Sequence, residues 1–353
     1  PDSLCFFNPD EPQEKITNNA DNVLKGFALR HEREWEKTYG QSSYFEKYVK
    51  GRKQSDPSRK KSTFEDVGRA SLSAFNARQW WTLTCRYFTV KRKDSINTAI
   101  LFLQAPVIAV LISMVFHDQG KENAATPLFL LIVSALWFGT SNSAREIVAE
   151  KAIYGRERMV NLGIASYVLS KYAVLGFLCF LQCAVLVGIV HPMVNLNGFI
   201  GSVFLFTFLV ALAGLSIGLF LSSLAGTQPA AIAIVPLVLL PMVILGGGML
   251  PVRDMGSSSS VLSHLVPSRW VYEKMLGIED TGNEENRAEK EKGDVALEED
   301  GERPPRQALH LGWVDRFFGD RVHKDGLILF VLAMYIFGFA GLAMLALKAK
   351  DKV

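Results

Sequence analysis

Several features that mark enzymes and metal-binding proteins are missing from this sequence of 353 residues. It has no glycine-rich phosphate loop of the form G-x-x-x-x-G-K-[S/T], so we expect no ATP site within it. Its four cysteines and six histidines are scattered, and their spacing fits neither a metal site nor a disulfide framework. No serine stands in a nucleophile elbow. The sequence therefore predicts no catalytic residue, no metal and no cofactor in this chain.

Ionisable side chains are also scarce in the long apolar stretches, where Gln104 and Gln182 are the main large polar groups. Carriers driven by protons or ions usually place carboxylates or histidines inside the membrane as relays. The energy for any transport must therefore come from elsewhere. The net charge of +3 is small, and no basic patch is interleaved with base-stacking aromatic residues, which argues against a nucleic-acid partner.

Apolar runs of membrane-spanning length are abundant, and hydrophobic residues make up 49% of the chain. Six runs come close to the roughly 20 residues that cross a bilayer as a helix. They lie at 98–116, 125–140, 172–190, 201–224, 229–246 and 327–347. The predicted fold class is therefore an all-α polytopic membrane protein with six transmembrane helices.

Six crossings place both termini on one side of the membrane. The short connections on that side carry most of the lysines and arginines, so the positive-inside rule predicts cytoplasmic termini in a plasma or inner membrane. The loop 247–326 is then extracellular. Within it, residues 284–303 alternate acids and bases with almost no apolar content, which predicts a solvated, disordered segment.

Residues 75–94 predict a helix of another kind. At 3.6 residues per turn, its basic and polar residues share one side and its apolar residues the other. The apolar side comprises Trp80, Trp81, Leu83, Thr84, Tyr87, Phe88 and Val90. Such a helix lies along a membrane surface, and this one leads directly into the first apolar run. The polar residues 1–74 before it are interpreted as a cytoplasmic linker.

A dense group of charges separates the second apolar run from the third, in the segment 141–171. It comprises Arg145, Glu146, Glu150, Lys151, Arg156, Glu157 and Arg158. Charges this dense are costly in hydrocarbon, so the chain must leave the bilayer here and return. Charged groups at a membrane end need partners, and we expect a docking soluble domain to supply them to Glu146 and Glu150. The segment is predicted to be the moving contact between the membrane domain and that domain.

In this order the features resemble the membrane half of ATP-binding cassette exporters of the type-2 permease class, most closely the G subfamily and its bacterial relatives. Residues 79–87 (QWWTLTCRY) look like the connecting helix of that family. The charged segment is similar to its first intracellular loop, whose coupling helix docks on the ATPase. Residues 266–273 (VPSRWVYE) match a segment that folds back into the outer leaflet.

The resemblance covers about residues 75–350 and implies the type-2 exporter transmembrane fold. The ATPase domain, with its ATP and Mg²⁺, is absent from this chain, and we expect it upstream in the native polypeptide or as a separate subunit. The acidic and basic residues of 284–303 stand where many animal relatives carry a cysteine-stapled outer loop, which favours a bacterial member.

The resemblance also implies a site. Two copies, or one copy and a homologous permease, would meet within the membrane lipids and enclose a cavity between them. Transport through this cavity would work by alternating access. Its expected lining is apolar and suits a lipid-like or amphipathic compound; it comprises Phe102, Phe129, Trp137, Phe138, Leu239 and Leu240. Met249 and Leu250 stand where relatives place a bulky apolar plug.

Two other functions stay open at this point. Export of a lipid-linked glycan would need a wider channel with aromatic rings at its mouth, a feature the sequence does not reveal. A membrane anchor or scaffold that moves nothing would explain six spans but leave the charged segment without a purpose. For Trp137 and Phe138, interfacial anchoring or packing is a better explanation than substrate contact. For Met249 and Leu250, ordinary packing is an equally good explanation.

Overall fold

The computed structural model describes residues 41, 45–46, 75–117, 123–295, 312–319 and 323–350, and for 285–295 the backbone alone. The chain divides into two units, Pro1–Ala70 and Ser71–Val353, and the helices below belong to the second. Apart from 41 and 45–46, the predicted linker 1–74 lies outside the described residues. So do residues 118–122, and residues 296–311 and 320–322 of the predicted extracellular loop.

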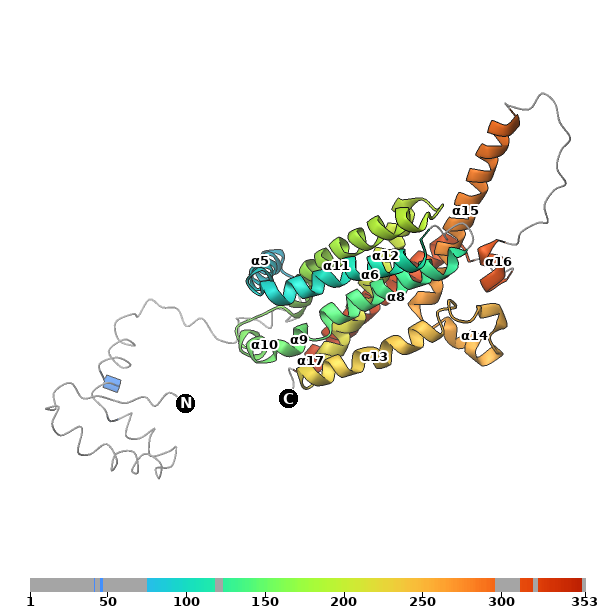
Figure 1. Ribbon diagram of the computed structural model, residues 1–353. Coiled ribbons are helices and arrows are strands. Elements are labelled where there is room, and N and C mark those ends of the chain that lie inside the picture. The colour runs from blue at the N-terminus through green and yellow to red at the C-terminus, as the bar shows by residue number, and fades with distance from the viewer. Residues whose placement is uncertain are drawn as a thin grey trace. The chain divides into compact units, whose positions relative to one another are not determined.

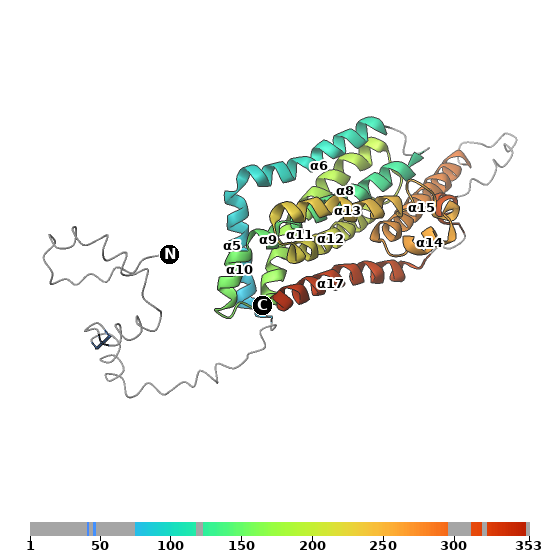
Figure 2. The ribbon, with the colours of Figure 1, turned by 90° about the horizontal axis from the view of Figure 1, so that it is seen from below.

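Five long apolar helices run side by side through the second unit (Figures 1 and 2). Within the described residues they are the helices long and apolar enough to cross a membrane. They are α6 (Ser95–Val115), α8 (Ala125–Ser143), α11 (Ile164–Val194), α12 (Ile200–Leu224) and α17 (Asp325–Lys350). A sixth apolar helix, α13 (Gln228–Ile244), has 17 residues, a length of about 26 Å. All six lie where the apolar runs predicted them, and the all-α polytopic fold is confirmed.

Helices α8 and α12 form the centre of the bundle because glycines let their backbones meet. A Cβ atom at Gly139 of α8 would lie 2.0 Å from the carbonyl oxygen of Ala211. A Cβ at Gly218 of α12 would lie 2.6 Å from the carbonyl oxygen of Thr140, and Gly214 is equally crowded. Small residues at such spacing permit close packing of membrane helices. Gly139, Gly214 and Gly218 therefore serve this close contact between α8 and α12.

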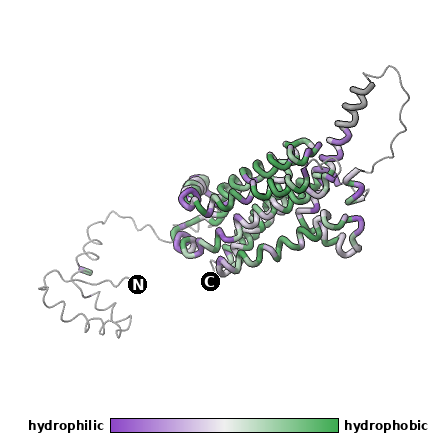
Figure 3. Tube along the Cα trace, viewed as in Figure 1, coloured by the Kyte–Doolittle hydropathy of each residue, from purple (hydrophilic) through white to green (hydrophobic). Residues whose placement is uncertain are grey.

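The other helices surround this pair: α11 packs on α6 and α12, α17 on α12, and α13 on α8. Helix α11 has 31 residues and is about 46 Å long, more than the roughly 30 Å of a hydrocarbon core. Figure 3 shows the resulting pattern, with hydrophobic sequence along the bundle and hydrophilic sequence gathered at its two ends. We call these the α10 end and the α14 end after the short helices there.

The α10 end carries α5 (Ala77–Lys93), α9 (Glu146–Ala149) and α10 (Lys151–Arg158). Helix α5 starts at an N-cap, where the Asn76 side chain accepts from two backbone N–H groups, and runs across the end of α6 (Figure 2). It is amphipathic, as predicted, but its apolar residues divide between two faces. Leu83 and Tyr87, one turn apart, are buried against the bundle, whereas Trp81 and Phe88 are 62% and 47% exposed.

The α14 end carries η2 (Val252–Asp254), α14 (Ser257–Ser263), α15 (Pro267–Val295) and α16 (Trp313–Phe318). The first half of α15 packs on α8 and α12, and its second half projects beyond the bundle (Figure 1). The prediction of disorder was therefore wrong for residues 284–295. In the sequence of this stretch, opposite charges three and four positions apart favour a helix.

Two neighbouring carboxylates fasten α15 to other segments. Glu279 accepts the backbone N–H groups of Asn197 (2.8 Å) and Gly198 (2.9 Å), between α11 and α12. Asp280 accepts those of Trp313 (2.8 Å) and Val314 (3.0 Å) at the start of α16. Burial raises the pKa of both carboxyls, and the hydrogen bonds they accept oppose that rise.

Candidate functional site

The acidic residues of the 141–171 segment find their partners on helices of this same chain. Glu146, at the start of α9, is buried and accepts hydrogen bonds from the hydroxyl of Tyr87 and from Lys91 Nζ, the latter at 2.6 Å. Both partners lie on α5. Burial and the adjacent Glu146 charge raise the pKa of Tyr87 well above its usual value, so its hydroxyl stays protonated and donates.

Glu150, one turn further along, joins the same group from the other side. Its Oε2 lies 2.6 Å from Nζ of Lys171 on α11, and the Tyr167 hydroxyl donates to it at 3.3 Å. The Lys171 side chain is only 2% exposed, and its ammonium stands 3.6 Å from the centre of the Tyr87 ring. A buried ammonium is stabilised only by such a carboxylate and aromatic face.

A third ion pair closes the arrangement at the end of α10. Arg86 of α5 donates from both terminal nitrogens to the two oxygens of Glu157, one of these bonds measuring 3.1 Å. The hydrogen bond to Glu157 raises the pKa of Arg86, which keeps the guanidinium charged. We name the whole group the charge clamp; it consists of Arg86, Tyr87, Lys91, Glu146, Glu150, Glu157, Tyr167 and Lys171.

The turn from α10 into α11 is fixed separately. Asn161 has a left-handed backbone (φ 65°), and its carbonyl oxygen accepts from Gln79 Nε2 at 3.2 Å. The Oε1 atom of the same Gln79 amide accepts a hydrogen bond from the backbone N–H of Gly163 at 3.0 Å. Arg158 donates to the carbonyl oxygen of Leu162 in the same turn. One side chain of α5 thus holds both sides of the loop.

These contacts correct one expectation from the sequence. We expected a soluble domain to supply the partners of Glu146 and Glu150, but they come from α5 and α11. The charges this segment leaves on its surface are basic: Lys151 and Arg156 are exposed and Arg145 is half-buried. Sequence reasoning treated the basic residues of α5 and α11 only as cytoplasmic charges.

An open groove lies beside the charge clamp, between α5 and α10, with a volume of about 510 Å³. Apolar Leu83 and Leu162 contribute to its lining, and Arg86, Arg156 and Glu157 add charge. Apolar side chains on α10 and after it are left uncovered: Ile153 is 42% exposed and Val160 is 80% exposed. Exposed aliphatic residues beside a charged groove are typical of a protein contact surface.

The polar residues noted within the apolar runs form a tie between three helices. Asn142 of α8 donates to Gln182 of α11 at 2.7 Å, and Gln182 donates to the carbonyl oxygen of Leu101 on α6 at 2.6 Å. Gln104 reaches Asn142 at 3.5 Å. Hydrogen bonds of this kind hold membrane helices together.

The six residues expected to line a cavity do not lie together. Phe129, Phe138 and Leu239 are buried in the core of the protomer, and Phe129 packs edge-on against Tyr272 with ring centroids 5.2 Å apart. A fully packed side chain offers a ligand no surface, so these three are corrected to core residues. The exposed residues of the set are Phe102 (37%), Trp137 (40%) and Leu240 (57%), on α6, α8 and α13.

The predicted plug follows a glycine turn at the α14 end. Gly247 has φ +90°, which a residue with a side chain rarely adopts. A Cβ at Gly248 would lie 2.1 Å from Cγ of Phe129, so the turn folds directly over that ring. Met249 and Leu250 come next and are 71% and 49% exposed. They are surface residues of this chain rather than part of its core.

Within the described part of the chain, no three His, Cys, Asp or Glu side chains gather where they could hold a metal ion.

Comparison with known proteins assigns the family. Residues 78–279, more than half of the chain, match the ABC-2 type transporter family. The chain is also 27% identical, over 153 residues, to an ABC transporter ATP-binding/permease protein of Mycobacterium tuberculosis. That match covers 41% of this chain and 18% of the mycobacterial protein. With its bundle of apolar helices and its charged loop, the chain belongs to the ABC-2 type transporter family, as a multi-pass transmembrane subunit of an ABC transporter.

Proposed function

We propose that this subunit exports a lipid-like or amphipathic compound, driven by an ATPase that docks at the α10 end. The observation that carries the proposal is the charge clamp. Two of its ion pairs join α5 to α9 and α10, and the third joins Glu150, between α9 and α10, to the long helix α11. A scaffold that moves nothing has no need of such a rigid link. The name of the mycobacterial relative, an ATP-binding/permease protein, supports an ATPase partner.

The groove between α5 and α10 is the proposed docking surface. Its exposed aliphatic and basic residues offer both parts of a protein interface, an apolar centre and a charged rim. A push on α10 passes through Glu150 and Lys171 to α11. A second route runs from α9 to α12, because Ser222 Oγ accepts the backbone N–H groups of Ile147 (2.9 Å) and Val148 (3.1 Å). On this proposal the groove and the chain ends face the cytoplasm of a plasma or inner membrane.

The substrate path is proposed on the face formed by α6, α8 and α13. Helix α8 contacts both of the others and lies between them in Figure 2. The exposed residues of the predicted lining, Phe102, Trp137 and Leu240, come from these three helices. Two copies meeting on this face would enclose an apolar cavity, which suits an amphipathic compound better than an ion.

Val160→Asp tests the docking surface. A charge on this 80%-exposed residue is expected to weaken ATPase binding by about 2 kcal/mol, roughly thirtyfold, as for a central interface residue. The measurement is the amount of ATPase that co-purifies with the chain at fixed concentration. Val261→Asp is the matched control, because Val261 is 69% exposed on α14 at the other end. Equal recovery with both variants would place the docking surface elsewhere.

Replacing Met249 and Leu250 together by alanine tests the plug. Both side chains are exposed, so folding should change by no more than about 1 kcal/mol. If two copies meet there, the gate loses bulk: ATPase activity of the assembly should persist or rise, with less transport per ATP. Leu250→Cys should also cross-link two protomers. Val261→Ala with Leu262→Ala is the control, since both are exposed on α14. If the Met249 and Leu250 double variant couples ATP hydrolysis to transport normally and Leu250→Cys does not cross-link, Met249 and Leu250 are ordinary surface residues.

A further inference from the structure

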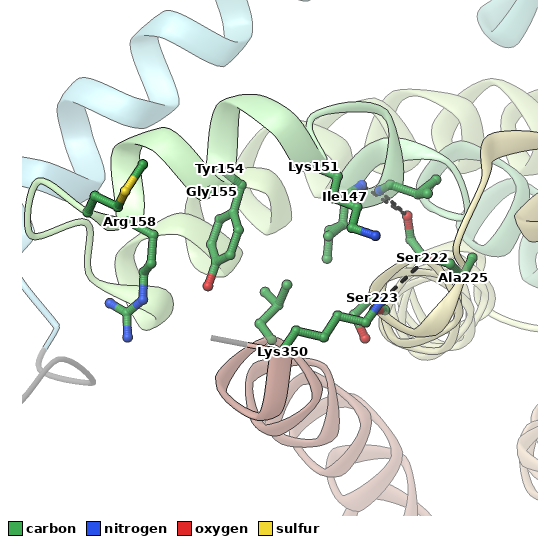
Figure 4. Close-up of a pocket in the computed structure, with 12 residues that line it drawn as sticks. Ile147, Lys151, Tyr154, Gly155, Arg158, Ser222, Ser223, Ala225 and Lys350 are labelled. Atoms are coloured by element: carbon green, nitrogen blue, oxygen red, sulfur yellow. Dashed lines mark hydrogen bonds between the residues drawn. The ribbon is translucent and has the colours of Figure 1, made fainter. Parts of the chain in front are cut away.

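A second cavity at the α10 end lies between α10 and the last turns of α12 and α17, with a volume of about 260 Å³ (Figure 4). Its lining includes three basic side chains, Lys151, Arg158 and Lys350. None of the described lining residues is acidic. The described lining of the cavity is therefore basic, and Arg158 within it donates to the carbonyl oxygen of Leu162.

The three basic side chains of this cavity differ in their position and in their hydrogen bonds. Lys350 bridges to the end of α12, where its Nζ lies 2.5 Å from the carbonyl oxygen of Ser223 and 3.2 Å from that of Leu224. Arg158 lies on the α10 side, next to Tyr154 (Figure 4). Lys151 is exposed, and the described residues offer it no hydrogen bond or ion pair. An anion in the cavity would meet the Lys151 ammonium directly.

The cavity stands where candidate membrane spans end. Three of the candidate spans end beside it: Ala125–Ala149, Ile200–Leu224 and Asp325–Lys350. Its floor is apolar and is formed by Ile147, Val148 and Leu347. Met344 lies one turn before Leu347 on the same side of α17 and is half-buried, so the apolar lining continues along this helix toward the hydrocarbon.

We propose that this cavity binds the phosphodiester head group of an anionic phospholipid, with its acyl chains along α17. Basic pockets between membrane helices suit such head groups, because lysine and arginine donate charge-assisted hydrogen bonds to phosphate oxygens. The apolar floor and the position at the end of three spans favour a lipid over an acidic protein segment. The site is separate from the proposed substrate face, so it does not depend on what the transporter exports.

The test measures binding of dioctanoyl phosphatidylglycerol to the full chain in detergent, by native mass spectrometry. Lys151→Gln should raise the dissociation constant about tenfold, the effect of losing one charge-assisted contact. The matched control is Lys348→Gln, an exposed lysine near the end of α17 that does not line the cavity. It should change the constant less than twofold. Dioctanoyl phosphatidylcholine and inorganic phosphate should both bind at least tenfold more weakly.

Three results would overturn the proposal. Equal weakening by Lys348→Gln would mean that general surface charge attracts the lipid. Phosphate binding as tight as that of phosphatidylglycerol would identify an anion site without a role for acyl chains. Unchanged lipid affinity in Lys151→Gln, with less co-purifying ATPase, would assign the cavity to an acidic segment of the ATPase. Thermal unfolding without lipid checks that both variants are folded; because both lysines are exposed, we expect parent-like curves.

Discussion

Glu150→Ala should destabilise the protein by about 3 to 5 kcal/mol, because it leaves Lys171 buried without its carboxylate. The Lys171 side chain is 2% exposed, and without Glu150 its closest charge-stabilising contact is the Tyr87 ring. The measurement is thermal unfolding of protein extracted from membranes, together with the folded yield. Lys151→Ala, an exposed neighbour, is the control and should unfold like the parent.

A double variant separates folding from coupling. Glu150→Ala with Lys171→Met removes both charges, and an apolar replacement of a buried pair is often neutral or stabilising. We expect it to recover most of the lost stability while the link from α10 to α11 stays broken. Its ATPase activity should then respond weakly to transported compounds. A stable Glu150→Ala single variant, or a double variant as unstable as the single one, would contradict this view of the charge clamp.

The second large effect is expected at the contact between α8 and α12. Gly218→Leu should cost about 3 kcal/mol or more, since its Cβ would approach the Thr140 carbonyl oxygen to 2.6 Å and the Ser143 Oγ to 2.0 Å. The serine side chain can rotate, but the backbone oxygen cannot, so the helices must separate. Loss of monodisperse protein and a lower unfolding temperature are the readouts.

Gly188→Leu on α11 is the matched control for that substitution. No atom lies within 4 Å of the position its Cβ would take, and the residue is exposed. A leucine there faces open space, and the variant should fold like the parent. Similar stability of the two leucine variants would mean that α8 and α12 are not as closely packed as described.

The apolar helices could be predicted from the sequence because a membrane span needs only length and hydrophobicity. The start of α11 could not, since its first two turns carry Tyr167 and Lys171 and look like loop. The sequence also could not show which residues of each helix face the inside of the bundle. Helices such as α8 are apolar all round, so Phe129 and Trp137 look alike although one is buried and the other is 40% exposed.

The contacts of the charge clamp could not be predicted from the sequence, for a different reason. Lys91 and Glu146 are 55 residues apart in sequence, and Arg86 and Glu157 are 71 apart. Nothing in the local pattern of either segment specifies the other. The charges of segment 141–171 predicted a structured departure from the bilayer, and the segment is ordered as α9, α10 and the start of α11. The sequence thus located the region but not the contacts within it.

The most direct test of the proposed function is ATP-dependent movement of a fluorescent amphipathic compound across vesicles containing this chain assembled with its ATPase. We predict accumulation on the side away from the α10 end, only with ATP, and its loss in Val160→Asp assemblies but not in Val261→Asp assemblies. Accumulation that needs no ATP, or none at all in an assembly that hydrolyses ATP normally when such compounds are present, would contradict the account.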